Sequence, residues 1–193
     1  FTMVEIKSAA AVDKTGCLPI EIRVREGASH SFAVSAGYNT DEGPGVRTSW
    51  EDRNILGGGE KVRVSLTYSE NEYSGDVVFR KPSFRRPDQN LILTVRLGSD
   101  HPPAYDSRSL RYSAILERFV GPVLTLGGGL AFKQDHVTQF GETKDFSLLS
   151  WILYGELDAR QQWGGNLSVR EEIVYAIKRE VVYYKGLVVY GHH

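Results

Sequence analysis

The chain has 193 residues, enough for one domain or for a small domain joined to part of a larger one. Its 23 Lys and Arg residues nearly balance its 24 Asp and Glu residues, so charge gives no argument for nucleic-acid binding. Cys17 is the only cysteine, which excludes an internal disulfide and a cysteine-based metal site, and we interpret it as a buried structural residue. No apolar run is long enough for a transmembrane helix, and twenty glycines and ten tyrosines favour an all-β chain.

The first predicted unit is a pair of strands at residues 1–29. Thr2 to Val12 and Leu18 to Arg25 are joined by a turn at Asp13 to Gly16. The second strand places its apolar residues on one face and its charges on the other, a pattern that needs a covering helix. No helix precedes it in this sequence. We therefore expect residues 1–29 to be the last strands of a domain whose beginning lies outside the chain.

Three short strands with alternating apolar and polar residues follow between His30 and Tyr68. Two glycine-rich segments, Asp41 to Gly45 and Gly57 to Gly59, supply the positive φ angles of tight reversals. Five further runs of the same kind are spaced along the sequence through residue 160, with no convincing helix between them. Residues 30–160 thus predict an antiparallel meander of about eight strands, in a sandwich or a barrel.

The tail, residues 161–193, is compatible with two structures. Ser168 and Glu171 resemble a capping box, and Ile173, Ile177 and Val181 have helical spacing. The same segment is rich in Val, Ile and Tyr, which favour strands. We favour further strands.

Alternation alone does not say whether the apolar face of the meander points inward or outward. Phe32, Tyr38, Trp50 and Tyr68 lie at strand ends on that face, as in the interfacial girdles of membrane barrels. The opposite face carries charges that suit a watery lumen: Arg47, Glu51, Arg63, Arg96, Arg111 and Glu117. The same residues are compatible with a soluble barrel that has an apolar core and a solvated exterior.

The sequence offers no arrangement typical of a catalytic or metal site. Its histidines lack ligand spacing, and there is no nucleophile elbow. The triple glycine at 57–59 lacks the Gly-Lys-Ser/Thr of a phosphate loop. We expect no cofactor, no metal and no enzymatic activity.

Two linked motifs resemble a known family. Residues 37–45 read GYNTDEGPG, and residues 50–60 read WEDRNILGGGE. Together they resemble the first barrel hairpin of the bacterial outer-membrane assembly factors, the superfamily of BamA, TamA and the D15-like surface antigens, and most closely TamA. The motif residues in this chain are Asp41, Gly43, Gly45, Arg53, Asn54, Gly57 and Gly59. Leu18 to Phe32 is similar to the last POTRA strand of the family running into the barrel.

The resemblance implies a fold and a non-enzymatic function. The fold would be the N-terminal part of a transmembrane β-barrel, preceded by POTRA strands in the periplasm. The function would be assembly or translocation of outer-membrane or autotransporter clients, with an inner-membrane or periplasm-spanning partner subunit. The client-pairing strand would be the first barrel strand: Ser31, Phe32, Ala33, Val34, Ser35, Ala36, Gly37, Tyr38 and Asn39.

Three features differ from the family pattern. Its barrels have sixteen strands, and this chain has room for about half. The arginine-glycine-aromatic motif of the lid loop and the aromatic C-terminal signature are absent from the sequence. We therefore expect a partial barrel, and we keep as the alternative a closed eight-stranded barrel that anchors in the membrane or binds a ligand.

Overall fold

A computed structural model describes residues 3–8, 18, 20–25, 27–39, 43–101, 106–159, 165–176 and 181–192. Within these ranges every regular secondary-structure element is a β-strand. No helix in this part of the chain is long and apolar enough to cross a membrane. Cys17, the turn at Asp13 to Gly16 and the motif residue Asp41 lie outside the described residues.

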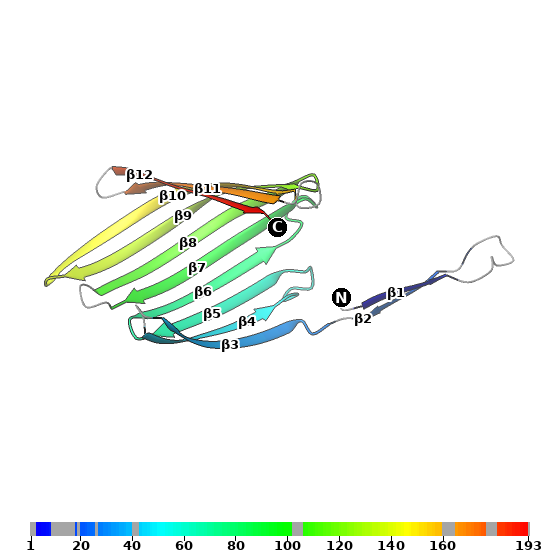
Figure 1. Ribbon diagram of the computed structural model, residues 1–193, viewed down its shortest axis with the longest axis horizontal. Helices are drawn as coiled ribbons and strands as arrows, with labels where there is room; N and C mark the ends of the chain where they lie inside the picture. Colours follow the sequence, from blue (N-terminus) through cyan, green and yellow to red (C-terminus); the bar gives the residue numbers. More distant parts are fainter. Residues whose placement is uncertain are drawn as a thin grey trace.

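The N-terminal unit is a two-stranded antiparallel hairpin. It consists of β1 (Met3–Ser8) and β2 (Ile20–Arg25), with Val4 opposite Val24 and Ile6 opposite Ile22. Figure 1 shows this hairpin projecting from one end of the large sheet. Its apolar residues share one face, as the alternation predicts, and that face is exposed.

The large sheet is a ten-stranded antiparallel meander in which each strand pairs with the next one along the chain. Its strands are β3 (His30–Asn39), β4 (Gly43–Asp52), β5 (Lys61–Ser69), β6 (Glu72–Lys81), β7 (Gln89–Asp100), β8 (Asp106–Val120), β9 (Leu124–Gln139), β10 (Glu142–Ala159), β11 (Gly165–Ala176) and β12 (Val181–His192). Figure 1 shows it as an open, curved sheet with β3 and β12 at its two edges.

The topology bears on two expectations. The sheet has ten strands: eight of them, β3 to β10, fall within residues 30–159, and β11 and β12 in the tail continue the same meander as strands. It does not close on itself in the described residues, since β3 and β12 are not paired. The closed eight-stranded barrel is therefore not the arrangement found.

Several strands are also longer than the sequence suggested. The sequence predicts a loop from Gly98 to Arg108, but β7 and β8 extend into this segment from both sides, and Asp100 pairs with Ser107. The sequence predicts a strand that starts at Phe146, but β10 begins four residues earlier, at Glu142. Strand ends inferred from the apolar pattern fall short of the observed ends, because backbone pairing continues where the side chains become polar.

Curvature distinguishes the two faces of the sheet. Arg111 on β8 donates to Glu172 on β11, three strands away, at 2.7 Å. Three strand spacings amount to about 14 Å in a flat sheet, too far for this contact, so the sheet must curve toward the face that holds both side chains. The charged face is therefore concave. The apolar face, with Phe32, Leu66 and Leu93 exposed on it, is convex.

A small apolar cluster lies on the concave face near the centre of the sheet. It consists of Ile115, Ala131 and Ile152, with Ile92 and Tyr154 packed against it. Gly129 allows β8 and β9 to approach closely there, since a Cβ at this position would lie 2.2 Å from the Ala114 carbonyl oxygen. The ring of Tyr154 lies over Gly127, its partner in the register. Glycines inside a strand indicate a bend or a close backbone approach, and the structure shows a close approach at Gly129.

Candidate functional site

The β3 edge is the first candidate site, because it is the strand that the family resemblance assigns to client pairing. β3 pairs with β4 alone in the described part of the chain, from His30 opposite Asp52 to Asn39 opposite Gly43. Its other side has no strand partner there. An edge of this kind presents a row of backbone donors and acceptors that another strand can use.

The pairing of β3 with β4 is weak toward the C-terminal end of β3. Gly37 faces Gly45 across the ladder, so that neither residue adds a cross-strand side-chain contact. Nothing lies within 4 Å of a Cβ built on Gly37. The apolar side chains of β3 are exposed on the convex face, with Phe32 at 70% and Tyr38 at 76%. The residues predicted for client pairing thus form one continuous exposed edge.

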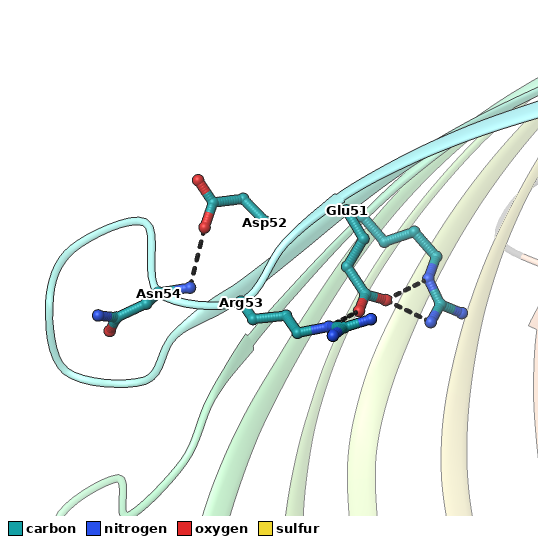
Figure 2. A network of polar contacts seen from close by, with 5 residues as sticks. Glu51, Asp52, Arg53 and Asn54 are labelled. Carbon is teal, nitrogen blue, oxygen red and sulfur yellow. Dashed lines mark hydrogen bonds and ion pairs between the residues drawn. The ribbon is translucent and has the colours of Figure 1, made fainter. Parts of the chain in front are cut away.

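The second candidate site is the turn between β4 and β5, which contains the Arg-Asn and triple-glycine motif. Asn54 organises it: its N–H donates to Asp52 Oδ1 (2.9 Å), and its Oδ1 accepts from the Gly59 N–H (2.7 Å). Figure 2 shows the turn as a closed loop beyond the end of β4, with Asp52 and Asn54 linked at its neck. Gly57 and Gly59 both have positive φ angles, +86° and +81°. A side chain at either position would be strained.

Arg53 belongs to a separate charge cluster on the concave face. Glu51 accepts from Arg53 Nε and from Arg63 Nε, both at 2.9 Å. Figure 2 shows the Glu51 carboxylate between two guanidinium groups, one of them from the labelled Arg53. The backbone N–H of Arg53 also donates to the Ser29 carbonyl, which ties the turn to the segment that enters β3. Arg53 therefore joins the segment before β3 to the turn between β4 and β5.

Glu60 attaches the same turn to the next hairpin. It is only 5% exposed, accepts from the Gly58 N–H at 2.9 Å and from Lys81 Nζ on β6 at 3.1 Å. Hydrogen bonds from its own backbone N–H and from Lys81 hold the pKa of the Glu60 carboxyl below its usual value. Glu60 was not predicted as a site residue, although it is the last residue of the motif at 50–60.

The neighbouring turns at this end of the sheet are linked in the same manner. Arg118 Nε donates to Asp88 at 2.8 Å, and this contact keeps the pKa of the Asp88 carboxyl low. The Phe119 N–H donates to the Asp88 carbonyl, and the Asp158 N–H donates to the Val123 carbonyl. We call this series of linked turns, residues 53–60, 82–88 and 121–123, the turn rim. It lies at the end of the sheet where the N-terminal hairpin joins.

A polar hub on the concave face was also missed. Glu117 on β8 accepts from Asn90 Nδ2 (2.8 Å), from the Tyr154 hydroxyl (2.7 Å) and from Arg80. These partners come from β7, β10 and β6, so a single carboxylate connects strands on both sides of β8. The sequence placed Glu117 on the polar face, but only the register brings Arg80 and Tyr154 within reach of it.

The four predicted interfacial aromatics all lie on the exposed convex face. Phe32 is opposite Trp50 in the register, at the end near the turn rim. Tyr38 and Tyr68 lie toward the other end, and Tyr68 makes an edge-to-face contact with Tyr73 at 5.0 Å. The aromatics therefore lie toward both ends of an apolar band, which is the distribution seen in membrane-spanning barrels.

No group of three or more His, Cys, Asp or Glu side chains in the described ranges could hold a metal ion. His136 contacts Asp145, as two exposed side chains of a cross-strand pair. The expectation that the chain lacks a metal site and catalytic activity stays a prediction.

Comparisons with known proteins agree with this geometry. A family model described as the Omp85 superfamily domain matches residues 54–172, more than half of the chain. The chain belongs to the Omp85 superfamily. A crystal structure of BamA from Haemophilus ducreyi lacking POTRA domains 1–3 has the same fold, with a TM-score of 0.72 at 12% identity. No curated protein sequence matches the chain significantly.

The match to BamA covers 90% of this chain but only 39% of that protein's chain. The chain thus spans less than half of the solved Omp85 structure that it resembles. The Omp85 model includes Asn54, Gly57 and Gly59 of the predicted motif, and it begins after β3 and β4. The superfamily assignment made from residues 37–60 is confirmed, whereas the closer resemblance to TamA stays a prediction.

Proposed function

We propose that this chain is the N-terminal barrel portion of an outer-membrane assembly or translocation factor, which inserts or secretes β-barrel or autotransporter clients. The observation that carries the proposal is the β3 edge, which is unpaired on its outer side in the described residues of an open Omp85-type sheet. An unfolded client strand could extend the sheet there by β-augmentation, and main-chain hydrogen bonds would supply the affinity.

The two faces of the sheet support a membrane location for this step. The convex face carries exposed Val34, Leu66, Leu93, Leu130 and Leu153, while the concave face carries the ion pairs. A bilayer on the convex side and water on the concave side would satisfy both faces. A soluble sandwich with the apolar face inward would require a second layer over the convex face, and no other described element covers it.

The proposed orientation places the turn rim and the N-terminal hairpin in the periplasm. Residues 1–29 would then be the last strands of a POTRA domain, and the exposed apolar face of β1 and β2 would pack against the rest of that domain. A partner subunit that spans the periplasm or lies in the inner membrane would contact this region. The links from Ser29 to Arg53 and from Glu60 to Lys81 would transmit its position to the barrel.

The experiment is site-specific photo-crosslinking in the full-length protein during insertion of a radiolabelled outer-membrane β-barrel precursor. A photoreactive residue replaces Ser35 on the β3 edge. In the matched control it replaces Thr94 on β7, which is paired on both sides with β6 and β8. We expect crosslinks to the precursor at position 35 and none at position 94. Absence of crosslinks at position 35 in a protein that inserts the precursor would refute the assignment of β3.

A further inference from the structure

A hollow of about 1040 Å³ lies in the sheet at the end far from the turn rim, over strands β5 to β10. Nothing in the proposed function uses it. Two rows of cross-strand neighbours on the convex face line it, one apolar and one polar. The apolar row contains Leu66, Leu97 and Leu110, with Gly75 between the first two. Gly75 adds no side chain, and the Leu66 side chain lies beside it.

The polar row lies two residues further along the strands. It runs from Tyr73 through Ser99 and Arg108 to His136 and Asp145 in direct register. Tyr73 contacts the His101 ring edge-on, with ring centroids 5.7 Å apart. Tyrosine at the boundary between an apolar and a polar surface is typical of a membrane interface, where its ring and its hydroxyl are both satisfied.

Arg108 is the cation available in this hollow. Both carboxylates in the lining have a cationic or histidine partner: Asp145 contacts His136, and Asp135 pairs with Lys133 at 2.8 Å. Arg108 is exposed and forms no ion pair with any residue that the structure describes. Asp106 lies on the same face of β8, two residues earlier, but it does not line the hollow. A guanidinium in this situation suits a phosphate, which it can bind through two hydrogen bonds.

We propose that this hollow is a binding site for the phosphate-bearing headgroup of a membrane lipid. The phosphate would contact Arg108, with the Tyr73 and Ser99 hydroxyls beside it. The acyl chains would lie along Leu66, Leu97 and Leu110, two of which are more than half exposed. Lipid is the occupant because the apolar row continues the convex face, which the proposed function places against the bilayer; the inference rests on that location.

The test measures lipid binding to the full-length protein in a phosphate-free detergent by native mass spectrometry. The probe is phosphatidylglycerol, compared with diacylglycerol carrying the same chains and with inorganic phosphate. The variant is Arg108→Gln. The matched control is Arg118→Gln, an arginine on the same face of the same strand that is paired with Asp88 outside the hollow.

We expect wild type and Arg118→Gln to retain one phosphatidylglycerol, and Arg108→Gln to bind it about five- to tenfold more weakly. Diacylglycerol and inorganic phosphate should each bind more weakly than the complete lipid. Equal affinity of Arg108→Gln and wild type would overturn the proposal, and so would equal binding of diacylglycerol. Client insertion measured on the same preparations separates the two claims: Arg108→Gln should insert clients normally, whereas a wild type that inserts none would contradict the proposed function instead.

Discussion

Arg111 on β8 and Glu172 on β11 form a 2.7 Å ion pair across two intervening strands. The contact has a geometric consequence, because strands three positions apart meet through their side chains only on the inside of a curved sheet. It therefore places the charged face inside and the apolar face outside. A curved meander with this polarity is one segment of a membrane barrel wall, as the Omp85 assignment requires.

The Glu117 hub should contribute to the stability of the barrel wall. Replacing Glu117 by Gln removes the charge that accepts from Arg80, Asn90 and the Tyr154 hydroxyl. We expect the full-length protein to lose about 2 kcal/mol of unfolding free energy, since the Arg80 guanidinium loses its charged partner. Urea unfolding in lipid vesicles measures this.

The control for the hub is Glu142→Gln. Glu142 pairs with Lys144 at 3.3 Å, and both side chains are largely exposed, so its loss should change stability very little. Equal losses for the two variants would contradict a structural role for Glu117.

Close packing of β8 and β9 predicts unequal effects at two adjacent glycines. A methyl group at Gly129 would meet the backbone of Ala114 and Ile115 at 2.2 and 2.7 Å, and backbone cannot move aside cheaply. We expect Gly129→Ala to cost about 3 kcal/mol or to prevent folding. Gly128→Ala should be tolerated, because the nearest atom to its methyl lies at an ordinary 3.5 Å. Heat-modifiable migration on gels compares the two, and equal tolerance would disprove the close approach.

The hydrogen bonds that the carboxylates of the turn rim accept should weaken at low pH. The carboxyls of Glu60 and Asp88 have pKa values below their usual 4.5 and 3.8, so their contribution is present above those values. It is lost as the pH falls through the lowered pKa values, when the carboxyls become protonated. The Gly58 amide donates to Glu60, and its hydrogen-exchange protection reports the change after correction for intrinsic rates. Protection should fall as the pH drops below the usual glutamate value of 4.5, and Glu60→Gln should show low protection at every pH.

A substitution of Gly37 on the β3 edge should change function without preventing folding. A side chain at Gly37 meets open space, so Gly37→Val should leave the fold intact. Valine favours strand conformation by up to about 1 kcal/mol over glycine, which should tighten the pairing of β3 with β4. We expect slower client insertion, with barrel stability in detergent equal to that of wild type or slightly higher. Insertion kinetics at matched protein levels measure this, and an unchanged rate would argue against a weak seam at Gly37.

Much of the fold could be predicted from the sequence because alternation is a local property. The apolar face of Phe32 and Tyr38 and the polar face of Arg47 and Glu51 follow from period two alone. The direction of curvature could not be predicted in this way, since an apolar face reads the same inside or outside a barrel. It required the contact between Arg111 and Glu172, which are 61 residues apart in the sequence.

Only some residues of the candidate site could be predicted, for a similar reason. Gly57 and Gly59 were found because tight turns require residues that adopt positive φ angles, and Asn54 was found through the family resemblance. Glu60 and Glu117 were missed as partners, because Lys81 and Tyr154 reach them only through the register of distant strands. The tail was compatible with a helix as well as with strands because β11 carries charges, including Glu171 on its convex face, that weaken its apolar pattern.

The most direct test of the central claim is the environment of two adjacent residues on β7 in the full-length protein reconstituted in lipid vesicles. Nitroxide labels are placed at Leu93, on the convex face, and at Thr94, on the concave face. Collision rates with oxygen and with a water-soluble nickel complex are measured for each label. The account predicts that position 93 is accessible to oxygen and shielded from nickel, and that position 94 shows the reverse. Nickel accessibility at position 93 equal to or above that at position 94 would contradict a barrel wall with its apolar face in lipid.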